Sequence, residues 1–105
     1  MANPAFEMRL PSRLKTRQLT LLMHLDDRRS ILGAAQAANM TQPAASKLLA
    51  ELEDTLGVTL FVRHARGVEP TWYGDVLLRH ARNALMELRY AQEEIADLRT
   101  RAVVG

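Results

Sequence analysis

Side chains able to bind nucleic acid occur at two places in the chain. The first is the stretch Thr41-Gln42-Pro43-Ala44-Ala45-Ser46-Lys47, where hydroxyl, amide and ammonium groups lie close together. The second holds Arg63 and Arg66, with two residues between them. Amides and hydroxyls can reach base edges, whereas guanidinium groups suit phosphates or a narrow minor groove. The elements around these residues must present both groups to solvent.

The first group opens a predicted helix from about Gln42 to Leu56, with Thr41 as N-cap and Gly57 after its end. At about 100° per residue, one side of this helix is apolar and must face a core. Its members are Ala45, Leu48, Leu49, Leu52 and Leu56. The opposite side is small, polar and singly basic, and consists of Pro43, Ser46, Lys47 and Ala50, with Gln42 at its edge. An ordinary solvated face has a similar composition, so this helix alone leaves both interpretations open.

Two shorter helices are predicted before it. Thr16 suits the N-cap of a helix that starts at Arg17 and ends in Asp26-Asp27-Arg28-Arg29. Its apolar stripe consists of Leu19, Leu22, Met23 and Leu25. Ser30 can cap a short, alanine-rich helix from Ile31 to Ala38, and the connection Asn39-Met40-Thr41 follows. Two helices joined by so tight a turn form a helix-turn-helix pattern.

After Gly57 the periodicity changes to that of strands. Thr59–Arg63 is predicted to be one strand, His64–Gly67 a tight turn and Val68–Pro70 a short return strand. A hairpin directly after a helix-turn-helix is a wing, and its turn would carry the arginines to a nucleic-acid backbone. The alternative is that these arginines only keep a sheet edge soluble.

A final helix is predicted from Thr71, its cap, to about Thr100. Apolar residues recur in it at alternating spacings of four and three, which is a heptad seam. The seam consists of Leu77, Ala81, Ala84, Leu88, Ala91, Ile95 and Leu98. A helix of about 30 residues is about 45 Å long, which is more than a small domain covers, so a second copy of the chain is the simplest partner. Leu78 and Leu85, to one side, would dock the helix on its own domain.

Composition limits the other function classes. The 105 residues suit one domain, and the absence of cysteine excludes disulfides and thiolate metal sites. The net charge is only +2, but residues 9–66 hold nine basic and five acidic side chains, whereas residues 67–105 hold five and six. A basic first part is compatible with phosphate binding. No apolar run predicts a membrane span and no secretory signal is evident, so a cytoplasmic location is expected.

Enzymatic and membrane-surface functions find little support in the sequence. His24, His64 and His80 lie on different predicted elements, and no pair of carboxylates shares a helix face with them. Phosphate-cradling glycine loops are absent too. The polar side of the last helix mixes acids and bases, which disfavours a membrane surface. We therefore expect no catalytic activity, metal or cofactor.

The ordered series of motifs resembles the N-terminal domain of LysR-type transcriptional regulators, from Arg17-Gln18-Leu19 to about Leu98. The most specific pieces are Ala34-Ala35, Thr41 to Lys47, Leu52-Glu53, Leu56-Gly57-Val58, Leu60-Phe61, Arg63, Arg66-Gly67-Val68, Thr71 and Gly74. The resemblance implies a mainly α, winged helix-turn-helix fold with three helices and a two-stranded wing, followed by a long dimerisation helix. It also implies sequence-specific binding of double-stranded DNA by a homodimer on an inverted repeat.

Carried over by position, the resemblance assigns DNA contacts to seven residues, with the third helix in the major groove and the wing on the backbone or in the minor groove. They are Thr41, Gln42, Pro43, Ser46, Lys47, Arg63 and Arg66. Gln42 can pair with an adenine edge, and Pro43 can contact a thymine methyl group. Ser46 and Lys47 can reach a base or a phosphate. Arg63 would support the contact of the wing with the DNA backbone.

Some residues depart from the family pattern. Arg29 occupies a position that is often held by glycine, and Gly33 occupies a position where a basic residue is common. Ala38 stands where a larger apolar residue is usual, and Met40 can fill the space that this leaves. Glu69-Pro70 is unusual in the wing and predicts a shortened return strand. These departures bear on affinity and site preference rather than on the fold.

The expected organisation has four parts. Residues 1–15 are predicted to be a flexible arm, 16–70 the winged helix-turn-helix, 71–100 the dimerisation helix and 101–105 the remnant of a hinge. LysR-type regulators carry a C-terminal effector-binding domain, so we expect this chain to be a fragment that meets no small-molecule effector by itself. The competing hypothesis is a protein-interaction module in which the long helix is the functional part; such a module would dimerise and ignore DNA at moderate salt.

Overall fold

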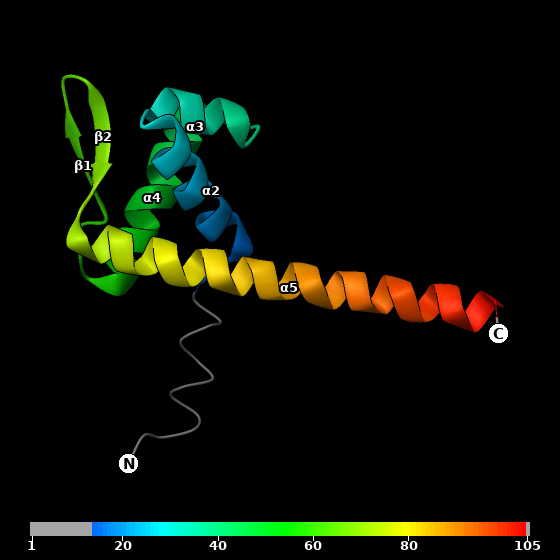
Figure 1. The fold of residues 1–105 in the computed structure, drawn as a ribbon. Coiled ribbons are helices and arrows are strands. Elements are labelled where there is room, and N and C mark those ends of the chain that lie inside the picture. Colours follow the sequence, from blue (N-terminus) through cyan, green and yellow to red (C-terminus); the bar gives the residue numbers. More distant parts are fainter. Residues whose placement is uncertain (1–13, 105) are drawn as a thin grey trace, which may run out of the picture.

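A computed structural model describes residues 14–104 of the chain (Figure 1). Its elements are α2 (Thr16–Arg28), α3 (Ile31–Ala37), α4 (Gln42–Leu56), β1 (Phe61–His64), β2 (Gly67–Pro70) and α5 (Trp72–Val104). The predicted mainly helical fold with a two-stranded wing and a long last helix is confirmed.

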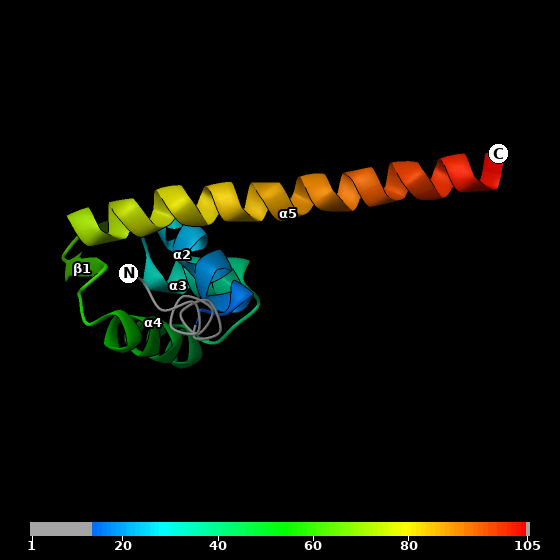
Figure 2. The same cartoon turned by 90° about the horizontal axis from the view of Figure 1, so that it is seen from below.

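Residues 14–70 form a head that sits on one end of α5. α2 lies between α4 and α5, so α4 and α5 are on opposite sides of the head (Figure 2). The β1–β2 hairpin projects away from α5 at the edge of the head, and the C-terminal part of α5 extends well beyond it (Figure 1). The face of α4 turned away from the core is therefore remote from the long helix.

The core of the head is aliphatic, with thin alanine contacts where the helices cross. Its least exposed members, all below a tenth exposed, are Leu21, Leu22, Leu25, Ile31, Ala34, Ala35, Ala45, Leu49, Leu52, Leu60, Phe61, Val68 and Leu78. Ala34 and Ala35 of α3 are fully buried, which lets α3 approach its neighbours closely. The apolar side predicted for α4 is confirmed, with Leu48 and Leu56 at its partly buried margins.

The caps of the helix-turn-helix match their sequence signals. The Ser30 hydroxyl accepts the Gly33 N–H at 3.0 Å, and the Thr41 hydroxyl accepts the Ala44 N–H at 3.2 Å. Asn39 adopts the left-handed conformation, with a φ of 55°. Met40 packs against the core, as its predicted filling role requires. These contacts span only a few residues, so the sequence contains all that they need.

The start and the buried face of α2 differ from prediction. Lys15, not Thr16, is the N-cap, and the Lys15 N–H is accepted by the Gln18 side chain at 3.0 Å. Leu14 packs against the core, so residues 14 and 15 belong to the head rather than to the predicted arm. The remainder of that arm, residues 1–13, lies outside the described residues. The buried side of α2 is centred on Gln18, Leu21, Leu22 and Leu25, whereas Leu19 and Met23 lie at its margin.

The wing also differs from prediction. β1 begins at Phe61 rather than at Thr59, and β2 runs the full four residues to Pro70, so the expected shortening of the return strand is wrong. Phe61 pairs with Pro70 and His64 with Gly67 in an antiparallel register. Pro70 is tolerated because it ends a strand at an open edge, where its missing N–H costs no ladder bond.

α5 starts where predicted but continues to Val104, so residues 101–104 are helical rather than a separate hinge. The Thr71 hydroxyl caps it by accepting the Gly74 N–H at 3.2 Å, and it also donates to the Thr59 carbonyl at 2.6 Å. Gly74 is buried, and a Cβ at this position would collide with the Leu60 carbonyl oxygen. α5 can therefore reach the head this closely only with glycine there.

The Gly74→Ala substitution should lower the free energy of unfolding by about 2–3 kcal/mol, because α5 must shift away from Leu60 to admit a methyl group. Chemical denaturation monitored by circular dichroism would measure this. Gly57→Ala is the control: Gly57 has a φ of 72° but open space around it, so only the left-handed conformation costs energy, about 1 kcal/mol. Equal losses for the two variants would contradict the close-approach argument.

Candidate nucleic-acid interface

The N-terminal half of α4 presents a polar surface to solvent. Thr41, Gln42, Pro43 and Lys47 are exposed, and Ser46 is half-buried beside them. Pro43 occupies the first turn, where the helix needs no N–H from it. The predicted polar face of α4 thus lies at the surface of the head, and its exposed side chains are available to a partner that approaches along the helix start.

Arg63 joins this surface to the wing. Its guanidinium Nη2 lies 3.5 Å from the Ser46 hydroxyl, although the two residues are 17 positions apart. Arg63 is itself exposed on β1. The fold therefore brings the two groups of side chains identified in the sequence to one surface, which the helix and the wing share.

Arg66 lies in the tight turn between the strands and is exposed. The turn is organised locally, since Nδ1 of His64 accepts the Arg66 N–H at 3.2 Å. His64 also has its Nε2 atom 3.7 Å from the Glu69 carboxylate across the hairpin. His64 thus shapes the turn that carries Arg66.

The wing is attached to the corner between α2 and α3. The Val68 N–H donates to the Arg29 carbonyl at 3.0 Å, and Val68 is buried. Gly67 has a φ of 133°, and a Cβ at this position would collide with the same carbonyl oxygen. This contact fixes the base of the turn relative to the helices of the head.

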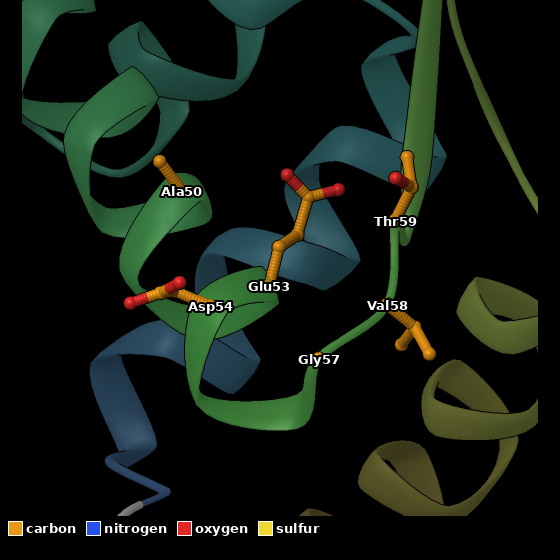
Figure 3. A pocket seen from close by; sticks show the side chains of 6 residues that line it. All are labelled: Ala50, Glu53, Asp54, Gly57, Val58 and Thr59. Atoms are coloured by element: carbon orange, nitrogen blue, oxygen red, sulfur yellow. The ribbon is translucent and has the colours of Figure 1, made fainter.

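Glu53 is a positioning residue that the sequence motifs contain but whose role they do not reveal. Its carboxylate accepts the Leu60 N–H at 2.6 Å and the Phe61 N–H at 3.3 Å. Figure 3 shows Glu53 directed toward the chain that leads into β1, whereas the adjacent Asp54 points away. The same bonds explain the late start of β1, because the Leu60 N–H is bound to α4 instead of a neighbouring strand.

The heptad seam of α5 divides into docked and free parts. Ala81 is buried against its own head, as is Leu78, and Leu77 packs partly against the same core. The assignment of Ala81 to an intermolecular contact is therefore wrong. The residues of the seam beyond the head are exposed; they are Ala84, Leu88, Ala91, Ile95 and Leu98. Leu85, predicted to dock, is half-buried.

Within residues 14–104, no cluster of three or more His, Asp or Glu side chains is arranged to hold a metal ion. None of the helices in this part of the chain is both long and apolar enough to span a membrane. The arrangement of polar face, wing and long helix defines a winged helix-turn-helix domain of the DNA-binding class.

Comparison with known proteins identifies the family. Residues 16–75 match the model described as bacterial regulatory helix-turn-helix protein, lysR family. The chain is 56% identical over 89 residues to the HTH-type transcriptional regulator GbpR of Azospirillum brasilense, covering 85% of this chain and 26% of that protein. It is 38% identical over 90 residues to PcaQ of Agrobacterium fabrum, covering 86% of this chain and 29% of that regulator.

Solved structures agree. The complex of the CbnR DNA-binding domain with DNA is similar with a TM-score of 0.73 at 28% identity, over 88% of this chain and 100% of that chain. Vibrio fischeri DarR, a member of the same family solved with DNA, gives 0.74 at 29% identity over 81% of this chain and 29% of that chain. The chain therefore belongs to the LysR family of bacterial helix-turn-helix regulators. It spans between a quarter and a third of the length of GbpR and PcaQ.

The Glu53→Ala substitution should lower the free energy of unfolding by about 2 kcal/mol, since it leaves two partly buried N–H groups without their acceptor. Glu53→Gln, which keeps one acceptor oxygen, should recover part of the loss. Asp54→Ala removes the same charge from the neighbouring exposed position and should be close to neutral. Thermal or urea denaturation compares the three variants, and a loss in Asp54→Ala as large as that in Glu53→Ala would refute the role assigned to Glu53.

Proposed function

We propose that this chain binds specific double-stranded DNA sequences as a homodimer, with α4 in the major groove and the wing beside it. The observation that carries the proposal is the shared surface on which the Arg63 guanidinium meets Ser46 of α4. A major groove about 12 Å wide admits one helix. The DNA backbone next to that groove then contacts the element of the protein that projects beside the helix. In this chain that projection is the wing.

The side chains of α4 divide into base-reading and anchoring roles. Gln42, at the exposed start of the helix, can pair with an adenine edge, and Pro43 can contact a thymine methyl group. Ser46 and Lys47, one turn further on, can reach a base or a phosphate. Thr41, whose hydroxyl already caps the helix, would face the DNA backbone next to the groove. Specificity would therefore reside mainly in the first two turns of α4.

The wing supplies sequence-independent affinity in this proposal. Arg66 is exposed in its turn, where a guanidinium can enter a narrow minor groove or bind phosphate. Arg63 would support the backbone contact from β1. The similarity to CbnR and DarR, both solved with DNA, supports a DNA partner of this kind.

Dimerisation is proposed through the free part of α5. Leu88, Ile95 and Leu98 are more than half exposed in the single chain, at 58%, 57% and 62%. An isolated helical segment with an apolar stripe gains stability by burying that stripe against another helix. Two heads joined in this way would reach an inverted repeat with half-sites roughly 34 Å apart.

The proposal extends to the whole regulator. GbpR and PcaQ contain a further two thirds or more of sequence that this chain does not match. Any small-molecule effector would bind through that part of such a regulator and not through residues 14–104. As a bacterial DNA-binding regulator, the protein would act in the cytoplasm, and this function requires no enzymatic activity.

Replacing base-reading and anchoring residues should give different signatures. Gln42→Ala or Ser46→Ala should reduce discrimination at one base step by about 1–3 kcal/mol. Arg66→Ala should weaken binding to all sequences and reduce the slope of log affinity against log salt by about one. Titrations at several salt concentrations, on a selected site and its scrambled version, measure both effects.

Arg99 is an exposed arginine on the free end of α5, so Arg99→Ala is the matched control for charge. It should leave the slope of log affinity against log salt unchanged. Equal affinity of the unmodified chain for selected and scrambled DNA would refute sequence-specific regulation. A chain that dimerises and ignores DNA at moderate salt would instead fit the interaction-module hypothesis.

The Leu88→Glu or Ile95→Glu substitution should weaken the dimer by at least about 100-fold, or roughly 2.7 kcal/mol, because a carboxylate cannot enter an apolar seam without a partner. Met86→Glu is the control, since Met86 is similarly exposed but lies about 160° around α5 from Leu88. Analytical ultracentrifugation over a concentration series measures the three dissociation constants. Equal weakening by Met86→Glu would show that the seam is placed on the wrong side of the helix.

A further inference from the structure

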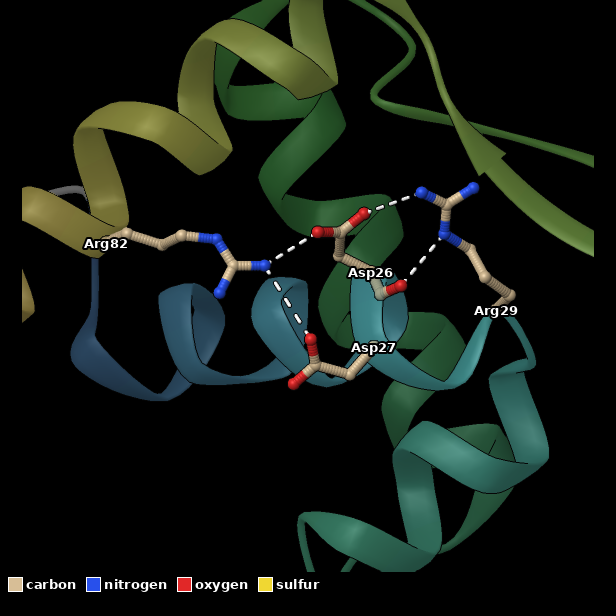
Figure 4. Close-up of polar contacts among 4 residues, drawn as sticks. All are labelled: Asp26, Asp27, Arg29 and Arg82. Carbon is tan, nitrogen blue, oxygen red and sulfur yellow. Dashed lines mark hydrogen bonds and ion pairs between the residues drawn. The ribbon is translucent and has the colours of Figure 1, made fainter.

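Two acidic residues occupy the last turn of α2, where they oppose the helix dipole. A helix C-terminus favours cations, so Asp26 and Asp27 do not stabilise α2 by their position. Asp26, however, lies between two guanidinium groups. Its Oδ2 atom is 2.6 Å from Nη2 of Arg82 on α5, and its Oδ1 atom is 2.9 Å from Nη2 of Arg29 (Figure 4). The carboxylate thus connects the long helix to the corner of the head.

Arg29 is the residue at that corner, and it is held in a conformation that side chains disfavour. Its φ of 54° and ψ of 29° are left-handed. Two bonds fix it there: Nε donates to the Asp26 carbonyl at 2.8 Å, and Nη2 donates to the Asp26 carboxylate. With Arg29 in this conformation, its carbonyl accepts the Val68 N–H of the wing at 3.0 Å.

The surroundings favour a lasting contact. The side chain of Asp26 is only 22% exposed, so its ion pairs are screened less than those of a fully solvated carboxylate. The neighbouring Asp27 is 62% exposed and reaches Arg82 only at 3.7 Å. The two aspartates therefore have the same charge and both lie in the last turn of α2, but only Asp26 makes close ion pairs with two arginines.

We propose that Asp26, oriented by Arg82, is a positioning residue for the wing. It holds Arg29 in the left-handed conformation, and the Arg29 carbonyl in turn fixes Val68 and the turn that carries Arg66. The relay runs from α5, which also bears the free seam, to the wing, so the seating of the long helix on the head determines where the wing lies. Its consequence for DNA binding rests on the wing contact proposed above.

The direct test is the exchange rate of the Val68 amide hydrogen, measured by NMR without DNA. Asp26→Ala should accelerate it by about 10-fold or more relative to the unmodified chain, because the acceptor carbonyl is no longer held in place. Arg82→Gln, which leaves α2 unchanged, should accelerate it in the same direction and provides the result if Asp26→Ala does not fold. Asp27→Ala is the matched control and should leave it unchanged. The proposal would be overturned if the Val68 amide exchanged no faster in Asp26→Ala or in Arg82→Gln than it does in Asp27→Ala.

The functional readout separates positioning from general destabilisation. Asp26→Ala and Asp27→Ala each remove one negative charge and so raise the net charge by one. Only Asp26→Ala should lose affinity for DNA, by about 3- to 10-fold. The slope of its log affinity against log salt should also fall toward that of Arg66→Ala. Discrimination by Gln42 should be unchanged. In the Arg66→Ala background the Asp26→Ala loss should disappear, since residues that act through one contact are not additive. Additive losses would overturn the positioning role.

The same series distinguishes failure of the relay from failure of the proposed function. If Arg66→Ala leaves DNA affinity unchanged, the proposed wing contact is wrong, while the Val68 exchange rates still decide whether Asp26 positions the wing. If Arg66→Ala weakens binding and Asp26→Ala behaves as Asp27→Ala does in both readouts, the relay is wrong and the wing contact stands.

Discussion

The close packing of α3 through its alanines is the constraint on which the remaining structure depends. Ala34 and Ala35 are completely buried, and Ala45 of α4 is nearly so. Because these side chains are small, the helix backbones can approach closely. The neighbouring leucines then fill the remaining space between the helices, so that the core is packed at the usual density of a protein interior. That approach sets the orientation of α4, and with it the direction in which its polar face points. A larger residue at these positions would move the surface that we propose to contact DNA.

The hairpin could not keep its place by its own stability. A two-stranded sheet of four-residue strands is marginal in water, so it needs support from the helices. Glu53 of α4 binds the entry to β1, Thr71 binds the backbone at Thr59 and caps α5, and the Arg29 carbonyl binds Val68. Each bond satisfies a backbone group of the hairpin or of the segment that leads into it, and each comes from a residue in or next to a different helix. The wing is thus positioned by the head as a whole.

α5 packs on the head with one segment and would form the proposed dimer with another. Its first turns contact the head closely at Gly74 and bury Leu78 and Ala81, whereas its later apolar residues remain exposed. Because one continuous helix would make both contacts, the position of a partner copy in the proposed dimer would be rigidly related to each head. The Arg82–Asp26 ion pair lies on the boundary between the two segments. In such a dimer, a change in helix pairing would change the spacing of the proposed DNA contacts.

The sequence by itself determined the features that depend on neighbours in the chain. The caps at Ser30 and Thr41, the left-handed Asn39, the bounds of α4 and its two faces all follow from hydrogen bonds and periodicity over a few residues. Only the tertiary structure decided the late start of β1, the burial of Ala81 in its own head and the role of Glu53. It also paired Asp26 with Arg82, which are 56 residues apart. The physical reason is that these depend on which distant backbone groups and charges meet, and neither periodicity nor local propensity carries that information.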